Sequence, residues 1–336
     1  MTQPTSVNMT FDTSLVDLNP NVSFSTTESD PSDLGPSISK TPAAQPPSLF
    51  EDPSQETPKQ SQSQFHNIPA QPPKPSTPVQ HVATQEAYDQ WAAIYDSDGN
   101  MLQAVDDIEL RTLLPEFLNQ VLSEVSTPTI SLLDLGCGTG RNTEKLLSFA
   151  LPLGRQSTVL GLDFSKGMLD LANAKLQVYN KGYEEPRVRL EQCDCFPTMT
   201  TSTAPPFPSV PGLTPVHGVI STLVLEHVPL PAYFATLASL LLPNGIAVIT
   251  NMHSDMGAKS QAGFVNKEGV KVRGSSSAHT VQATVDEAAR SGFEVMSVKE
   301  REVTKADMGS GAIGERGWKW VGTKVWYGLV VRKVSW

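Results

Sequence analysis

Three glycines at alternate positions, Gly136, Gly138 and Gly140, directly follow an apolar run, and a carboxylate, Asp163, follows the next one. Glycine lets a chain turn sharply and approach a ligand closely because it has no Cβ. At the carboxyl end of a parallel strand, a carboxylate can accept both hydroxyls of a ribose. The pattern therefore predicts a nucleoside site. Two alternatives are a tight strand-to-helix turn without a ligand and a cap for the following helix, which Ser165 or Asp163 would provide.

The segment around the glycines reads Asp-Leu-Gly-Cys-Gly-Thr-Gly and resembles motif I of class I S-adenosylmethionine-dependent methyltransferases. Its spacing differs from the G-x-G-x-x-G of dinucleotide enzymes. In the methyltransferase family this loop holds the methionine part of the cofactor. The resemblance therefore implies S-adenosyl-L-methionine as the cofactor, bound by residues of this loop: Asp134, Gly136, Cys137, Gly138 and Gly140.

The same resemblance assigns roles to two acidic segments further along. In the family, the acid in the position of Asp163 binds the ribose, and Phe164 beside it belongs to the cofactor site. Asp194 matches the acid that accepts from the adenine amino group, with Cys195 next to it and Phe196 as a ring that can pack on the base. The alternative for Asp194 is an ordinary exposed loop acid.

A fourth apolar run, 218–225, continues into Glu226-His227, which resembles the segment after the family's fourth strand. In a metal-dependent branch from ubiquinone biosynthesis, another Glu precedes this pair by four positions. Thr222 stands there in this chain, so we expect no metal and assign Thr222 to the cofactor site. His227 and His253 both follow predicted strands, and an imidazole suits the removal of an acceptor's proton near neutral pH. For His227, a ring that satisfies a backbone carbonyl is the alternative.

Ahead of these motifs, Tyr88, Trp91 and Tyr95 recur at helical spacing within 84–96. The run resembles the N-terminal helix of many small-molecule methyltransferases, in which aromatic side chains close over cofactor and substrate. We therefore add Tyr88 and Tyr95 to the predicted cofactor site. Aromatic side chains that simply fill the core are the alternative, and both can hold together.

The elements that position these residues alternate between strand and helix. This order predicts an α/β fold with a doubly wound sheet. The resemblance implies a mostly parallel, seven-stranded, Rossmann-like sheet whose last strand is antiparallel. The expected strands are 130–135, 158–165, 188–192, 218–225, 246–250, 293–303 and 324–334. The expected helices are 106–125, 141–150, 166–179, 232–242 and 280–290, with a hairpin at 264–272.

Composition divides the chain into a tail, 1–82, and a methyltransferase-like domain, 83–336. Residues 1–80 hold 14 of the 27 prolines and no arginine, and they contain few apolar residues, so we expect a disordered tail that can bind a protein partner. No run is apolar and long enough for a membrane span. The net charge of −10 argues against nucleic acid as a partner. The three cysteines lack metal-ligand spacing and predict an intracellular, cytoplasmic protein.

Together these features predict S-adenosylmethionine-dependent methyl transfer to a small-molecule acceptor. The resemblance is to small-molecule enzymes of the ubiquinone and menaquinone type and to fungal methyltransferases, which favours a setting in secondary metabolism. The alternative from another class is a methyltransferase-like regulator or a non-catalytic helper in a pathway.

Overall fold

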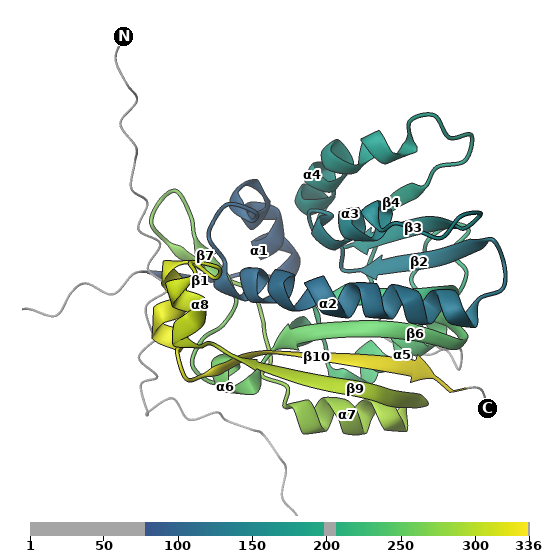
Figure 1. Cartoon of the computed structure of the whole chain (residues 1–336). Coiled ribbons are helices and arrows are strands. Elements are labelled where there is room, and N and C mark those ends of the chain that lie inside the picture. The colour runs from purple at the N-terminus through teal and green to yellow at the C-terminus, as the bar shows by residue number, and fades with distance from the viewer. Residues whose placement is uncertain (1–77, 198–205, 335–336) are drawn as a thin grey trace, which may run out of the picture. The chain divides into compact units, whose positions relative to one another are not determined.

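The computed structural model describes residues 78–197 and 206–334, and its centre is a seven-stranded sheet (Figure 1). The strand order is β4-β3-β2-β5-β6-β10-β9. The strands are β2 (Thr129–Leu135), β3 (Gln156–Asp163), β4 (Val188–Gln192), β5 (Val216–Thr222), β6 (Leu241–Met252), β9 (Phe293–Glu302) and β10 (Lys324–Lys333). The predicted tail lies almost wholly outside the described residues.

The sheet reverses its direction of growth at β2. From there the chain builds β3 and β4 on one side and then returns to add β5 and β6 on the other. All these pairs are parallel, whereas β10 runs antiparallel to both β6 and β9. The predicted doubly wound α/β fold is thereby confirmed. The carboxyl ends of β2 and β5 lie side by side at the reversal, where open α/β sheets bind ligands.

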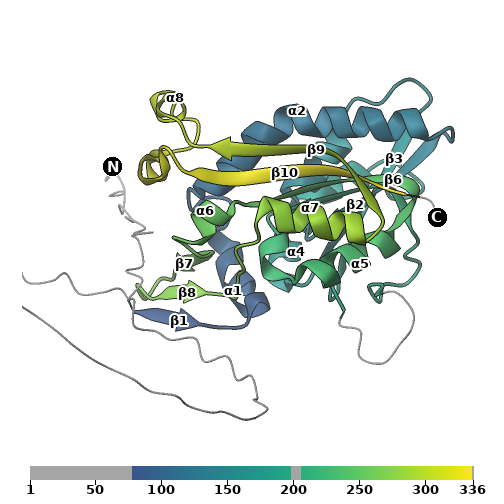
Figure 2. The ribbon, with the colours of Figure 1, turned by 90° about the horizontal axis from the view of Figure 1, so that it is seen from below.

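Helices cover both faces of this sheet (Figures 1 and 2). On β2, Ile130 and Leu132 pack into one core cluster and Leu133 and Leu135 into the other, as the two-residue period of a strand requires. The first cluster includes α2 (Met101–Glu124), α3 (Arg141–Ser148) and α4 (Lys166–Leu176), and the second includes α5 (Leu230–Leu240) and α7 (Val281–Arg290).

A second, three-stranded sheet stands apart from the main one (Figure 2). Its antiparallel strands β7 (Gly263–Val265) and β8 (Lys271–Arg273) form the predicted hairpin. β1 (Val79–His81) adds to β8 in parallel, because the free edge of β8 offers main-chain hydrogen bonds that composition does not reveal. Residues 78–82, which were expected to belong to the tail, are therefore part of the described fold.

Two predicted strand boundaries differ from the structure by three residues or more. The fourth strand ends at Thr222, and Leu225–His227 forms a 3-10 turn instead of continuing it. β6 starts at Leu241, five residues early, because the expected turn at 243–245 is a bulge between two paired stretches. Asn244 adopts a φ of 62° within this bulge.

Helix boundaries also shift. α2 begins at Met101, five residues before the prediction, because the Asn100 side chain accepts from the main-chain N–H groups of Leu102 and Gln103 and caps it. The aromatic helix is α1 (Thr84–Trp91), extended by a 3-10 turn, Ala92–Ile94. The short helices α6 (Ser254–Gly257) and α8 (Lys305–Gly309) and the 3-10 segment Glu315–Trp320 complete the C-terminal half.

Candidate active site

The glycine turn after β2 is held against β3 by its own main chain. The N–H groups of Gly136 and Cys137 both donate to the carbonyl of Leu162, at 2.8 and 2.9 Å. Gly136 has a φ of +77°, and a Cβ there would lie 2.4 Å from Cγ2 of Val224. Only glycine therefore allows the ends of β2 and β5 to approach this closely.

Asp163 at the end of β3 fastens the same turn. Its buried carboxylate accepts from the N–H of Gly138 at 2.8 Å and from that of Ser165 at 2.8 Å. Burial raises the pKa of this carboxyl to about 6, although the main-chain donors act to lower it. Ser165, and not Asp163, caps α4 through its hydroxyl. The acid is thus an acceptor facing the turn.

Two adjoining cavities lie at this edge of the sheet. The first, of about 350 Å³ and called the larger cavity below, opens at the carboxyl ends of β2, β3, β4 and β5. Most of the predicted cofactor residues line it: Tyr88, Tyr95, Gly136, Gly138, Asp163, Phe164, Asp194, Cys195 and Thr222. His227 and Phe196 line it as well. Residues separated by more than 130 positions in the chain thus meet around one space.

Three predicted cofactor residues do not line the larger cavity but support it from behind. Buried Asp134 accepts from the Thr143 hydroxyl at 2.6 Å, and burial raises its pKa to about 6. Cys137 is buried, which raises its thiol pKa well above the usual value. Gly140 begins α3, and a Cβ there would lie 2.8 Å from Leu176. These residues shape the turn, since strand and helix pack directly against them.

At the far end of the larger cavity, the chain after β4 presents Asp194 and Phe196. The Asp194 carboxylate accepts from the N–H of Phe196 at 3.0 Å and is otherwise exposed. The Phe196 ring stacks on Tyr233, with centroids 5.3 Å apart and planes at 23°. An acid beside a fixed flat ring suits a purine base, which offers an amino donor and a π-face.

Helix α1 forms one wall of the larger cavity. Its Asp89 accepts from the Ser165 hydroxyl at 2.6 Å and from the N–H of Gly167 at 3.0 Å, both at the start of α4. Asp96, just beyond α1, accepts from the Thr139 hydroxyl in the glycine turn at 2.8 Å. The helix is therefore tied to both neighbouring strand ends. Its aromatic side chains line cavities and also pack in a core cluster with Phe264.

His227 ends the 3-10 turn after β5 and lies between α1 and the chain before α7. Its Nδ1 is 2.7 Å from the Ser275 carbonyl and its Nε2 is 2.8 Å from the Tyr88 hydroxyl. A carbonyl only accepts, so Nδ1 carries a proton, and in the neutral ring Nε2 accepts from Tyr88. Glu226 Oε1 lies 3.4 Å from Nε2. The ring thus satisfies a carbonyl and keeps one nitrogen available as a base.

The structure does not bring His253 to the site. Its Nδ1 accepts from the N–H of Asp255 and thereby caps α6, while Nε2 lies 2.8 Å from Glu300. The side chain is buried and lines neither cavity. The position after β6 is near the site, but the side chain turns away to meet these two partners. We therefore withdraw His253 as a base.

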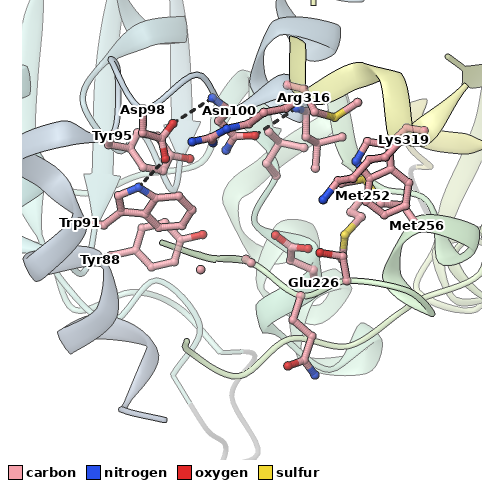
Figure 3. A pocket seen from close by; sticks show the side chains of 18 residues that line it. Tyr88, Trp91, Tyr95, Asp98, Asn100, Glu226, Met252, Met256, Arg316 and Lys319 are labelled. Atoms are coloured by element: carbon pink, nitrogen blue, oxygen red, sulfur yellow. Dashed lines mark hydrogen bonds between the residues drawn. The ribbon is translucent and has the colours of Figure 1, made fainter. Parts of the chain in front are cut away.

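A smaller cavity of about 90 Å³ adjoins the larger one (Figure 3). Tyr88, Tyr95 and Leu223 line both and form the boundary between them. Leu223 has a φ of 57°, a strained conformation for a leucine that is typical of functional sites. The boundary residues place any group in the smaller cavity next to the ligand of the larger one.

Sequence reasoning missed most of the smaller cavity. Asp98 lines it, accepting from Trp91 Nε1 at 2.8 Å and from the N–H of Asn100 at 2.9 Å. Burial raises the pKa of Asp98, and the positive charge of Arg316 opposes that rise. Trp320, at the end of the 3-10 segment, lines it too. The one available clue was Asp98-x-Asn100, a pattern typical of a side-chain-stabilised turn.

The larger cavity fits S-adenosylmethionine. A Cβ at Gly138 would meet no atom within 4 Å, so open space lies directly against the main chain of the turn. Asp163 supplies an acceptor for hydroxyls, and the rings of Tyr88 and Tyr95 supply faces that attract a sulfonium cation. Among the described residues no group of His, Cys, Asp and Glu is arranged to hold a metal ion. Nor is any helix within 78–197 or 206–334 long and apolar enough to cross a membrane.

Comparison with known proteins identifies the family. Residues 126–282 match the family model described as a methyltransferase domain. A protein of Emericella nidulans, named as an uncharacterized methyltransferase, is 41% identical over 268 residues, which cover 75% of this chain and 91% of the relative. The chain belongs to the methyltransferase family. It is an enzyme of that family, and its cofactor is S-adenosylmethionine, which supplies a methyl group already activated as a sulfonium.

Similar solved structures are more distant. A S-adenosylmethionine-dependent methyltransferase from Mesorhizobium loti is 20% identical, with a TM-score of 0.43, covering 63% of this chain and 95% of that one. The [4+2]-cyclase SpnF is 13% identical, with a TM-score of 0.46, covering 78% and 100%. Neither likeness is close enough to support an activity for this methyltransferase.

Proposed function

We propose that this methyltransferase transfers the methyl group to a small-molecule acceptor that binds in the smaller cavity. The observation that carries the proposal is the shared boundary, because Tyr88, Tyr95 and Leu223 line both cavities. A space of about 90 Å³ admits a small group. The net charge of −10 also opposes nucleic acid as an acceptor. A cytoplasmic setting in secondary metabolism remains part of the proposal.

Residue roles follow from this arrangement. Asp163 accepts from the ribose hydroxyls and Asp194 from the adenine amino group, while Gly138 allows the cofactor to lie against the glycine turn. Tyr88 and Tyr95 help to hold the acceptor in line with the methyl group. They also exclude water from the boundary, which prevents hydrolysis of the cofactor. His227 Nε2, which faces the Tyr88 hydroxyl at 2.8 Å, takes the proton that an acceptor releases.

The test is methyl transfer from labelled S-adenosylmethionine by the full chain, offered a set of small amines, phenols and thiols beside a protein and an RNA. Label is expected in at least one small molecule and in neither macromolecule. Label found only in a macromolecule would refute the proposal. A chain that failed to bind the cofactor in calorimetric titration would refute it as well.

A further inference from the structure

Glu226 stands in the smaller cavity as a carboxylate with one unsatisfied oxygen. The residue is 3% exposed, and among the described residues Oε2 has no hydrogen-bond partner. Oε1 lies 3.4 Å from His227 Nε2. A buried carboxylate oxygen without a partner is costly, since burial removes its water without replacing the hydrogen bond. An oxygen in this state at the wall of a cavity indicates a ligand that donates to it.

The main chain fixes Glu226 in this position. Its N–H donates to Asn251 Oδ1 at 3.0 Å, and its carbonyl accepts from the N–H of Ser277 at 2.7 Å. These two contacts join the turn after β5 to β6 and to the segment before α7. The main chain that carries this carboxylate is therefore anchored beside the cavity, and Figure 3 shows the carboxylate among the lining side chains.

The other charged groups of the cavity do not satisfy Glu226. Both oxygens of Asp98 already accept hydrogen bonds, and the charge of Arg316 acts on that carboxyl. Lys319 places its Nζ 5.2 Å from the centre of the Trp320 ring. Burial raises the pKa of Glu226, and the opposing charge is that of His227. The uncompensated acceptor in this space is therefore Glu226 Oε2.

We infer that the methyl acceptor is an amine whose N–H group donates to Glu226 Oε2, an inference that rests on the proposed function. An amine suits the cavity better than an alcohol does because it can bring positive charge to the buried carboxylate. The aromatic rings of Tyr88, Trp91 and Tyr95 also attract a cation through their faces. A hydroxyl group offers a hydrogen bond but no charge.

The transfer balances with these residues. An amine that arrives protonated gives one proton to Glu226, which frees the nitrogen lone pair. This lone pair forms the new N–CH₃ bond, while the electron pair of the broken S–CH₃ bond stays on sulfur and leaves a neutral thioether. The positive charge passes to nitrogen beside Glu226. The product leaves as the methylated ammonium ion, and Glu226 passes its proton to His227 Nε2, which lies 3.4 Å from its Oε1, so the carboxylate is restored.

The test measures binding without turnover. The full chain, saturated with S-adenosylhomocysteine, is titrated by calorimetry with isobutylamine, benzylamine and 2-phenylethylamine, each against the alcohol of the same skeleton. At least one amine is expected to bind about tenfold more tightly than its alcohol. Glu226→Gln, which keeps the shape and removes the charge, should abolish that preference. Glu294→Gln, the same change at an exposed residue of β9, should keep it.

Equal binding within every pair, no binding by any amine, or a preference that survives Glu226→Gln would overturn the inference. If Glu226→Gln does not fold, Glu226→Asp, which withdraws the charge by one methylene, must weaken amine binding instead. S-adenosylhomocysteine affinity in the same titrations separates the two proposals. If the cofactor still bound and the methyl-transfer assay labelled alcohols alone, the inference of an amine acceptor would be wrong and the proposed function would stand.

Discussion

The larger and the smaller cavity share a wall but are built from different parts of the fold. The larger one lies at the ends of four parallel strands, where main-chain turns and one buried acid, Asp163, define its floor. The smaller one lies beyond the ends of β5 and β6 and is lined mainly by side chains from α1, the start of α2 and the 3-10 segment near Trp320. The strand ends are fixed by the pairing of the whole sheet, whereas the side chains of the smaller cavity depend on how separate segments dock.

This difference separates what the two cavities can do. A site made by strand ends holds one ligand in one pose, which suits a cofactor common to many reactions. A site made by side chains of added segments can change without disturbing the sheet, which suits an acceptor that differs between enzymes. Changes at the larger cavity should therefore affect cofactor binding, and changes at the smaller cavity should affect the acceptor.

The largest effect is expected from Gly136→Ala, because the new Cβ would stand 2.4 Å from Val224 at a φ of +77°. Left-handed strain and overpacking together should lower the free energy of unfolding by about 2–5 kcal/mol and disrupt cofactor binding. Gly269→Ala, at the tip of the β7–β8 hairpin, has a φ of +75° but no atom near its Cβ. It should cost about 1–2 kcal/mol and leave binding intact. Equal losses in denaturant melts would contradict the steric argument.

Next in size, Asp163→Asn should weaken cofactor binding by about 1.5–3 kcal/mol, the range for a hydrogen bond to a charged group. Asp170→Asn makes the same change on the exposed side of α4, where Asp170 pairs with Lys166, and should leave binding unaltered. Isothermal titration with S-adenosylhomocysteine measures both. An unchanged affinity in a folded Asp163→Asn variant would remove Asp163 from the ribose site.

The same carboxyl predicts a pH dependence. Its pKa of about 6 in the free protein lies above the ordinary 3.8, and ribose hydroxyls donate to the ionised form. Affinity should therefore fall as pH drops below 6, by up to about tenfold per unit, and level off above 7. Asp163→Asn should flatten this profile. The stability of the free protein changes with pH in the opposite direction. Between pH 3.8 and 6 this carboxyl holds its proton in the folded chain but has lost it in the unfolded chain, so the free energy of unfolding falls as pH rises.

How far the sequence predicts each cavity follows from the same contrast. Gly136 and Asp163 were identified because strand period, turn chemistry and order along the chain determine where they lie. Asp98 and Arg316 stand more than 200 positions apart, and their meeting depends on tertiary docking that no local pattern encodes. His253 follows a strand end as predicted, but chain position does not determine the direction of its ring. β1 escaped detection because main-chain pairing has no compositional signature.

A smaller effect is expected where the two cavities meet. Tyr88→Phe keeps the ring but removes the hydroxyl that faces His227, while Tyr95→Phe makes the same change at the other tyrosine of the boundary. Loss of that one bond costs about 1 kcal/mol, so Tyr88→Phe should lower kcat several-fold and change cofactor affinity little. Tyr95→Phe should resemble the parent. If both variants lowered kcat equally, a specific Tyr88–His227 contact would not explain the effect.

The smallest effect concerns the N-terminal boundary and compares two truncations. A chain that begins at Thr77 retains β1 and should bind cofactor and melt like the full chain. A chain that begins at Ala83 loses β1 and its pairing with β8, including the Val82 N–H to Arg273 carbonyl bond of 3.0 Å. This sheet carries Phe264, which stacks on Trp91 at 5.4 Å beside the smaller cavity.

The shorter chain should therefore lose about 1 kcal/mol of stability and bind the acceptor less well, with unchanged affinity for the cofactor. Differential scanning calorimetry measures the stability, titration with S-adenosylhomocysteine measures the affinity for the cofactor, and methyl-transfer rates at varied acceptor concentration measure the binding of the acceptor. A drop in cofactor affinity for the chain that begins at Ala83 would mean that the two cavities are coupled through α1 and are not independent parts of the fold.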